Sequence, residues 1–323
     1  MADAVSTPLR EEKVAVIGSG LIGRSWCMLF ACAGYKVSLY DVDPEQVSRA
    51  LDDIRVQLEK LQEEGLPRGT LSAQQQLDRI SPVGSVKDCL QGAFYIQECV
   101  PERLELKQQV WAELDSQVSG DVILASSSSA LLPSLISEKL SNRSRFIVVH
   151  PTNPPFYAPL VELIPAPWTA EDVVPTTRTL MDCIGQDPIV LNREIDGFVL
   201  NRIQYAIMGE GWRLIRDGIV SVADLDRVMS SGLGVRYAFV GPFETAYLNA
   251  DGFVSYCDRY RDMIYRVQRS AGDPELMDGD TMERVQSGME QVAGPVSELD
   301  SRRQWRDRRL LGLAKLKRDL SEK

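Results

Sequence analysis

The segment KVAVIGSGLIGRSW, residues 13–26, constrains the fold of this chain more than any other. Its apolar run is typical of a buried β-strand, and three glycines spaced G-x-G-x-x-G follow where a helix is expected to begin. Gly18 makes a tight turn, Gly20 lacks a side chain that would block a pyrophosphate, and Gly23 lets helix and strand pack closely. The segment therefore predicts a doubly wound α/β domain that binds a dinucleotide.

The start of that helix and the end of the next strand complete a candidate cofactor site. Leu21 and Ile22 lie in the first helical turn, where free N–H groups and the helix dipole favour phosphate oxygens. Asp41 ends the next apolar run, KVSLYD. A carboxylate there hydrogen-bonds the adenosine ribose and repels a 2'-phosphate, which predicts NAD rather than NADP. The alternatives are FAD, which uses a similar loop, and a glycine-rich turn without a ligand.

Apolar runs alternate with helix-length segments from residue 13 to residue 192, and long helical segments follow. The alternation is typical of βαβ units around a buried, mostly parallel sheet. We expect two domains, a Rossmann-like NAD-binding domain of residues 1–194 and an all-helical domain of residues 195–323. A long helix that begins at Asp43-Pro44 and stops at Gly65 is expected to project from the sheet as an arm.

The charge and the cysteines exclude several classes of function. The chain carries a net charge of -10, and its Lys and Arg residues are scattered, which argues against nucleic acid or an anionic membrane as a partner. No apolar run reaches the ~20 residues that span a membrane, and the N-terminal segment lacks the apolar core of a targeting signal. The chain contains no C-x-x-C pair, so its cysteines do not indicate a metal site. We expect a cytoplasmic protein that acts on a small molecule.

The only histidine, His150, follows an apolar run in RFIVVHPTNPP, and Glu162 lies inside another, LVELI. A carboxylate in an apolar strand is costly to bury unless it is paired, and His150 is the nearest single partner. A carboxylate that is hydrogen-bonded to one nitrogen of an imidazole fixes the tautomer of the ring. The other nitrogen can then accept a proton from an alcohol. This pattern predicts a general base, and the alternatives are a capped core histidine and an exposed edge-strand carboxylate.

These motifs resemble the 3-hydroxyacyl-CoA dehydrogenase superfamily over nearly the full chain. The family has a Ser after the fifth strand, an H-x-x-N-P turn, a V-E-hydrophobic strand and a G-F-hydrophobic-hydrophobic-N-R segment. The matching residues are Ser129, His150, Asn153, Pro154, Glu162 and Asn201. The resemblance implies that His150 is the catalytic base and that Glu162 orients it. It also implies that Ser129 and Asn201 bind the reacting oxygen and that Asn153 faces the cofactor.

Two further details of the resemblance concern the cofactor side. The family has an E-x4-K element that reaches NAD, and Glu102 and Lys107 in ECVPERLELK match it. The usual Asn-Thr before the family's Ser is Ser-Ser here. Four consecutive serines, residues 126–129, therefore leave open which of them acts.

The resemblance also implies an activity, namely NAD-dependent oxidation of the 3-hydroxyl of a sugar acid, L-gulonate to 3-dehydro-L-gulonate, by hydride transfer. It further implies a homodimer formed through the helical domain. The alternatives are a 3-hydroxyacyl-CoA dehydrogenase and a mainly structural lens protein. In acyl-CoA members the arm after the second strand is rich in lysine, whereas residues 45–64 here hold six acidic and three basic side chains. Such an arm should repel CoA.

A sugar acid needs a cation that holds its carboxylate, and the planar fork of arginine suits a carboxylate better than lysine does. Arg236, in SSGLGVRYAFVGP, is the candidate within the helical domain. The alternative is a surface arginine that caps a helix end.

The assignment of Asp41 generates a first prediction. Asp41→Ala should weaken the use of NAD and narrow its advantage over NADP, because both the ribose hydrogen bonds and the repulsion of the 2'-phosphate are lost. Steady-state kinetics with the two cofactors measures this ratio. An unchanged NAD to NADP preference would mean that the ribose is bound elsewhere.

Overall fold

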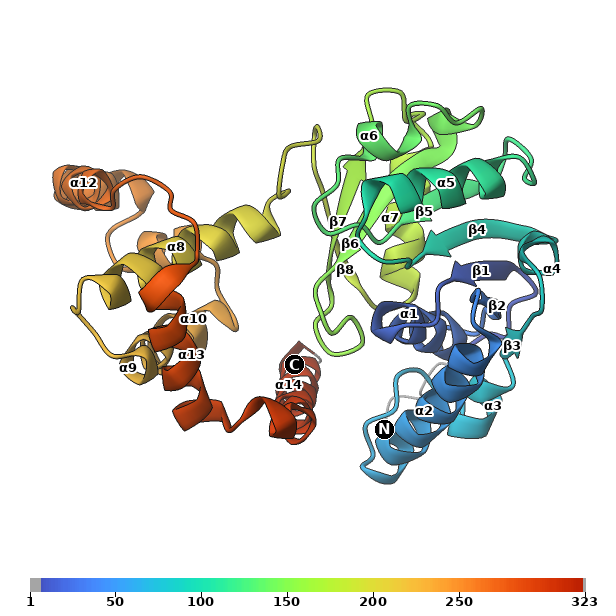
Figure 1. The fold of residues 1–323 in the computed structure, drawn as a ribbon, viewed down its shortest axis with the longest axis horizontal. Coiled ribbons are helices and arrows are strands. Elements are labelled where there is room, and N and C mark those ends of the chain that lie inside the picture. The colour runs from blue at the N-terminus through green and yellow to red at the C-terminus, as the bar shows by residue number, and fades with distance from the viewer. Residues whose placement is uncertain (1–6, 322–323) are drawn as a thin grey trace. The chain divides into compact units, whose positions relative to one another are not determined.

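The computed structural model describes residues 7–321, which divide into two compact units (Figure 1). The first unit takes the chain up to residue 202 together with its end from residue 307, and the second unit is residues 203–306. The first residues of the N-terminal segment considered above for a targeting signal lie outside the described residues. No helix within residues 7–321 is long and apolar enough to cross a membrane.

The first unit is built on one eight-stranded sheet with the order β3-β2-β1-β4-β5-β6-β7-β8. The strands are β1 (Lys13–Ile17), β2 (Lys36–Tyr40), β3 (Ile80–Pro82), β4 (Ala93–Glu98), β5 (Ile123–Ser126), β6 (Phe146–Pro151), β7 (Leu160–Pro165) and β8 (Asp187–Val190). All neighbouring strands are parallel except β6 and β7, which pair antiparallel. The predicted mostly parallel, doubly wound sheet is confirmed, and only the short edge strand β3 was not predicted.

Helices cover both faces of this sheet. They are α1 (Leu21–Cys32), α2 (Pro44–Glu63), α3 (Ala73–Leu77), α4 (Val86–Leu90), α5 (Leu104–Asp115), α6 (Pro133–Ser137), the 3-10 turn η1 (Arg143–Arg145) and α7 (Val173–Cys183). Residues of α1, α2 and α7 form one apolar core with the sheet, and residues of α4, α5 and α6 form a second core. The fully buried Trp26 and Trp111 belong to these two cores respectively.

The long helix α2 begins and ends as its sequence predicts. The side chain of Asp43 accepts a hydrogen bond from the N–H of Glu45 at 3.0 Å, and Pro44 opens the first turn, where its missing N–H is no loss. Gly65 follows the last turn with a φ of 67°. One apolar stripe of α2 is buried, namely Val47, Ala50, Ile54, Leu58 and Leu61. The other faces of α2 carry charged side chains to solvent.

The regular elements among the described residues of the second unit are all helices. Its elements are most of α8 (Leu200–Arg216), α9 (Val222–Arg227), the π-helical segment η2 (Val228–Leu233), α10 (Gly234–Tyr237), α11 (Pro242–Leu248), α12 (Phe253–Ser270), α13 (Gly279–Ala293), η3 (Val296–Glu298) and the first turns of α14 (Leu299–Ser321). The segment PFETAYLNADGFVSYCDRYRDMIYRVQ forms two helices, α11 and α12. They are separated at Gly252, whose φ is 92°.

The end of the chain groups with the first unit. Leu311 of α14 is only 8% exposed and belongs to the same apolar core as residues of α1 and α2. Nη1 of Arg318 donates a hydrogen bond to the carbonyl of Pro67 at 3.5 Å. The sequence led us to expect every residue after 194 in the helical domain. In the structure α8 and α14 each contribute residues to both units.

Candidate functional site

The glycine loop between β1 and α1 forms an open cradle. Gly18 has a φ of 100°, and a Cβ added there would lie 2.9 Å from the carbonyl oxygen of Cys99. A Cβ on Gly23 would collide with the carbonyl oxygen of Gly18, so helix and loop pack without room for a side chain. A Cβ on Gly20 would meet no atom within 4 Å. The space in front of the α1 N-terminus therefore fits a pyrophosphate.

Asp41 directly follows β2 and is held beside this loop. Its Oδ2 atom accepts hydrogen bonds from the backbone N–H of Ser19 at 2.7 Å, from the Ser19 hydroxyl at 2.9 Å and from Nε2 of Gln46 at 3.0 Å. The sequence predicted Asp41, but it did not indicate Ser19 or Gln46. Both residues fix the carboxylate beside the glycine loop, and its contact with the ribose stays a prediction.

The four serines after β5 use their hydroxyls differently. Three of them are hydrogen-bonded within the protein: Ser126 to Glu98, Ser127 to Gln97 and Trp26, and Ser128 to Glu102. The fourth, Ser129, is exposed, and its Oγ has no hydrogen-bond partner among residues 7–321. Ser129 is therefore the serine of this loop whose hydroxyl is available to a ligand.

Glu102 hydrogen-bonds to the serine loop, and Lys107 lies 3.5 Å from its carboxylate. Oε1 of Glu102 accepts the Ser128 hydroxyl at 2.6 Å and the N–H groups of Ser129 and Ala130 at 2.9 and 3.0 Å. Burial by itself raises the pKa of Glu102, but the Ser128 hydroxyl, the Lys107 charge and the backbone donors lower the pKa below its usual value. Nζ of Lys107 is 2.8 Å from Oε1 of Glu98 in a buried ion pair. Both residues support the loop, and their contact with the cofactor stays a prediction.

His150 and Glu162 are direct cross-strand neighbours in the β6–β7 pair. Nδ1 of His150 lies 2.7 Å from Oε2 of Glu162, and the side chains are 5% and 0% exposed. An ionised carboxylate only accepts hydrogen bonds, so Nδ1 of His150 is the donor of this pair. Nε2 has no hydrogen-bond partner in the described chain. The carboxylate therefore fixes the orientation of the imidazole and leaves Nε2 free for a ligand.

The second oxygen of Glu162 binds the start of α8. Oε1 accepts the N–H groups of Val199 at 2.8 Å and Leu200 at 3.0 Å, which are free donors at a helix N-terminus. Burial by itself raises the pKa of Glu162. The hydrogen bonds from His150, Leu200 and Val199 outweigh burial and lower the pKa below its usual value. The carboxylate therefore stays ionised beside the imidazole.

Asn201, in the first turn of α8, connects this helix to the serine loop. Its Nδ2 donates to the carbonyl of Ser129 at 2.7 Å, and the residue is buried. Ser129, His150, Glu162 and Asn201, predicted from separate motifs, thus come together in the first unit. Sequence reasoning missed Phe198, whose ring centroid is 5.5 Å from that of His150. The Gly-Phe pair just before a helix is the signal that could have indicated it.

The remaining predicted residues make no contact that fixes their role. Asn153 is exposed in the turn after β6. Arg236 is exposed on α10 of the second unit, and its guanidinium forms no hydrogen bond or ion pair with any other described residue. Leu21 is exposed and Ile22 half-buried at the start of α1. No cluster of three or more His, Cys, Asp or Glu within the described range could hold a metal ion.

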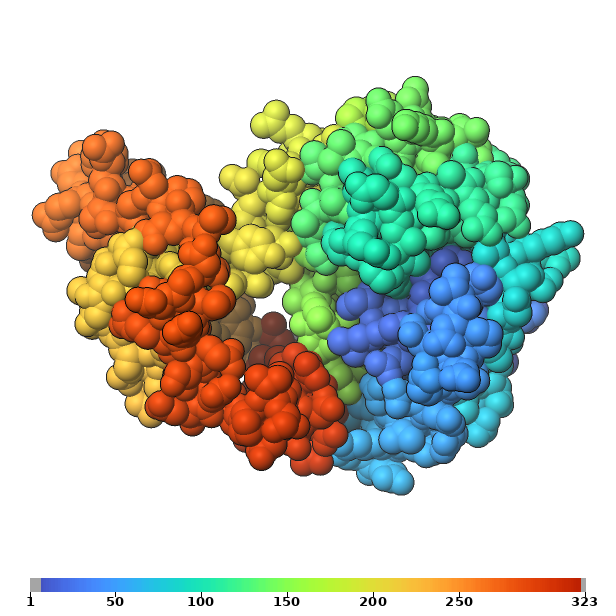
Figure 2. Space-filling view, in the orientation of Figure 1, coloured from blue at the N-terminus to red at the C-terminus, as the bar shows by residue number. Residues whose placement is uncertain are grey.

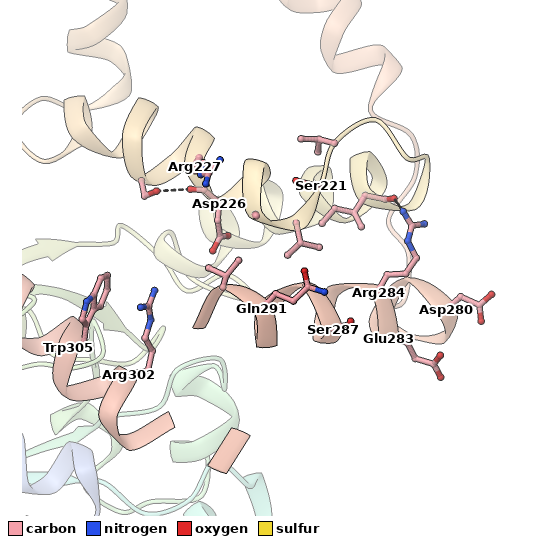
Figure 3. A pocket seen from close by; sticks show the side chains of 17 residues that line it. Ser221, Asp226, Arg227, Asp280, Glu283, Arg284, Ser287, Gln291, Arg302 and Trp305 are labelled. Carbon is pink, nitrogen blue, oxygen red and sulfur yellow. Dashed lines mark hydrogen bonds between the residues drawn. The ribbon is translucent and has the colours of Figure 1, made fainter. Parts of the chain in front are cut away.

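The helical unit contains a groove of about 1230 Å³ that includes none of the predicted site residues. Figure 3 shows Ser221, Asp226 and Arg227 on one wall and residues of α13 on the other, among them Glu283 and Gln291, with Arg302 and Trp305 at one end. Its lining mixes acidic, basic and apolar side chains. Because none of the predicted residues lines this groove, the cluster around His150 remains the candidate site.

A doubly wound sheet with a glycine loop, an acidic residue after its second strand and a buried carboxylate–imidazole pair defines an NAD-dependent dehydrogenase. Two family models match the chain: the NAD binding domain of 3-hydroxyacyl-CoA dehydrogenase over residues 13–195 and the C-terminal domain of the same enzyme over residues 197–288. The chain therefore belongs to the 3-hydroxyacyl-CoA dehydrogenase family, and NAD is its cofactor.

Several known proteins are similar over most of their length. Lambda-crystallin of Oryctolagus cuniculus is 51% identical over 308 residues, which cover 95% of this chain and 97% of that protein. L-carnitine dehydrogenase of Oceanobacillus iheyensis is 32% identical, covering 90% and 94%. An NAD+-dependent 5-formyl-3-hydroxy-2-methylpyridine 4-carboxylic acid 5-dehydrogenase superimposes with a TM-score of 0.77 at 25% identity, covering 94% and 98%. Within its family the chain thus groups with the lambda-crystallins.

The lowered pKa of Glu162 generates a prediction about stability. A carboxyl whose folded pKa lies below its unfolded pKa stabilises the fold above the unfolded value, near 4.5, and loses this contribution as pH falls through the folded pKa. Glu162→Gln should therefore be less stable than the wild type at neutral pH, and the difference should shrink below about pH 4.5.

Chemical denaturation across this pH range measures the difference in the free energy of unfolding. Glu105→Gln, a change at an exposed glutamate of α5, is the control and should track the wild type. A constant deficit of Glu162→Gln at every pH would show that the charge of Glu162 does not stabilise the fold.

Proposed function

We propose that this NAD-dependent dehydrogenase oxidises the 3-hydroxyl of a sugar acid, with L-gulonate as substrate and 3-dehydro-L-gulonate as product. The observation that carries the proposal is the charge of α2. Its exposed acidic side chains are Glu45, Asp52, Asp53, Glu59 and Glu63. Its exposed cations, Arg49 and Arg55, are each within 4 Å of carboxylates on or beside the same helix.

A CoA thioester brings several phosphate charges, and an arm of this kind repels them and offers no unpaired arginine. A small free acid places no such demand on α2. One relative, the L-carnitine dehydrogenase named above, by its name also acts on a substrate other than an acyl-CoA. These observations favour a small hydroxy acid over a 3-hydroxyacyl-CoA.

The buried pair of His150 and Glu162 supports an active enzyme rather than a purely structural lens protein. A carboxylate that is completely buried is costly unless it is compensated, and packing alone gives no reason to retain it. In our proposal Nε2 of His150 removes the proton of the 3-hydroxyl. Glu162 then balances the charge of the imidazolium that forms.

NAD would be held by the glycine loop and Asp41, and when bound it supplies the acceptor of the hydride that leaves the carbinol carbon. The free hydroxyl of Ser129 and the amide of Asn201 would orient the reacting oxygen. The hydrogen bond from the Asn201 amide to the Ser129 carbonyl keeps the two residues adjacent, which supports a shared role in binding that oxygen. Arg236, which has no ionic partner in the described chain and follows the π-helical segment η2, would bind the carboxylate of the substrate.

We further propose a cytoplasmic homodimer that forms through the helical unit. All six cysteines are free thiols, which fits a reducing compartment.

The proposed dimer interface is the surface of the helical unit around α12. Helix α12, orange in Figure 2, contains no buried residue. Its Phe253, Tyr256 and Tyr260 continue a row of ring contacts that begins at Phe243. An exposed apolar surface of this kind is typical of an interface between subunits.

The substrate proposal is tested by NADH formation with L-gulonate and with a short 3-hydroxyacyl-CoA. We expect turnover with L-gulonate and little with the thioester. His150→Gln should lower kcat by ~10²-fold or more, while the KM for NAD changes little. Preferential oxidation of the thioester would contradict the sugar-acid proposal. Turnover by His150→Gln close to that of the wild type would contradict the base assignment.

Arg236 is tested in the same assay. Arg236→Ala should raise the KM for L-gulonate by roughly tenfold to a hundredfold, which corresponds to losing one charge-assisted pair. The KM for NAD and the reaction of a neutral polyol should not change. Arg227→Ala is the matched control, because Arg227 is exposed in the same unit and paired with Asp224 at 3.0 Å. If both variants behave alike, or acid and neutral substrates weaken together, Arg236 is not the carboxylate ligand.

A further inference from the structure

Phe198, just before α8, combines features that a packing role alone does not require. Its φ of 51° makes it the one non-glycine residue in the described chain with a left-handed backbone. This conformation is unfavourable for a bulky side chain and persists only where the surroundings enforce it. The side chain is nevertheless completely buried. Such strain is typically retained at functional sites.

The backbone of Phe198 directs donors toward Glu162. Gly197, with a φ of 73°, and Phe198 are two successive left-handed residues. They turn the chain so that the next two N–H groups, those of Val199 and Leu200, both reach Oε1 of Glu162. A residue in the ordinary right-handed or extended region would send these groups elsewhere. The turn thereby fixes one oxygen of the carboxylate whose other oxygen holds His150.

The ring of Phe198 acts on the same pair from another side. Its centroid lies 5.5 Å from the imidazole centroid, with an angle of 58° between the planes. The terminal torsion of a histidine is broad and is restricted mainly by its neighbours. The buried ring of Phe198 therefore limits rotation of the His150 imidazole. It also keeps water from the Nδ1–H···Glu162 hydrogen bond, which is stronger in an apolar environment.

We propose that Phe198 is a positioning residue of the catalytic site. Its left-handed backbone orients Glu162 through Val199 and Leu200, and its ring holds the imidazole of His150 in the plane that leaves Nε2 facing the substrate. The effect on turnover rests on the proposed role of His150 as the base. The effect on the imidazole itself is independent of any substrate.

The single histidine makes the imidazole directly observable. Protein labelled with [15N]histidine gives one set of ring signals, and the proton on Nδ1 in a buried hydrogen bond to a carboxylate gives a separate downfield resonance. Two variants of Phe198 are compared with the wild type. Phe198→Leu keeps an apolar side chain without the aromatic wall, and Phe198→Gly relieves the backbone but removes the ring.

Phe146→Leu is the matched control. Phe146 lies at the other end of β6, is equally buried, and packs against Trp111 with 5.1 Å between ring centroids. Its ring contact is with Trp111 and not with His150, so its loss reports only the effect of removing a core ring. Thermal denaturation establishes that each variant is folded. If Phe198→Gly does not fold, Phe198→Leu carries the test.

We expect the Nδ1 proton of both Phe198 variants to exchange faster with water and its signal to broaden, while Phe146→Leu keeps the wild-type spectrum. We also expect kcat to fall by roughly tenfold to a hundredfold, as for small misplacements of a catalytic group, with NADH affinity unchanged. A wild-type imidazole spectrum in folded Phe198→Leu would overturn the proposal, whatever the substrate is. Equal spectral changes in Phe146→Leu would overturn it as well.

Discussion

The buried carboxylate of Glu162 is the interaction on which the candidate site depends. One oxygen holds the imidazole of His150 from the neighbouring strand, and the other binds the first free N–H groups of α8. Two strands and a helix N-terminus therefore meet at a single negative charge. Burial alone would favour the neutral acid, and the three hydrogen bonds reverse this preference. The orientation of the His150 imidazole and the start of α8 are consequently specified by the same group.

Much of the fold was predictable because its periodicities are local. The glycine loop, the alternation of apolar runs and the cap at Asp43 each report on neighbouring residues, and the corresponding elements are present. The short edge strand β3 was missed because three residues give no periodic signal. The return of the last helix to the first unit depends on a contact between distant parts of the chain. No local pattern indicates it.

The part of the candidate site that could be predicted consists of polar residues that are unusual in apolar segments of the sequence. A lone histidine and a glutamate within an apolar strand indicated their pairing, and the antiparallel register of β6 and β7 explains it. The sequence could not predict which serine hydroxyl is free, since the four serines are identical and differ only in the side chains that surround them in the fold. Lys107 is a related case. The sequence shows a lysine at the family's position, but its burial against Glu98 follows from the packing of α5.

The position of Leu311 bears on how the protein is made. Synthesis proceeds from the N-terminus, and domains generally begin to fold as they emerge from the ribosome. The NAD-binding unit, however, takes part of its apolar core from α14, and Arg318 reaches a carbonyl 251 residues earlier in the sequence. The nascent unit must therefore keep a patch of its core uncovered while the whole helical unit is translated. The nucleotide-binding unit becomes complete only when α14 has left the ribosome.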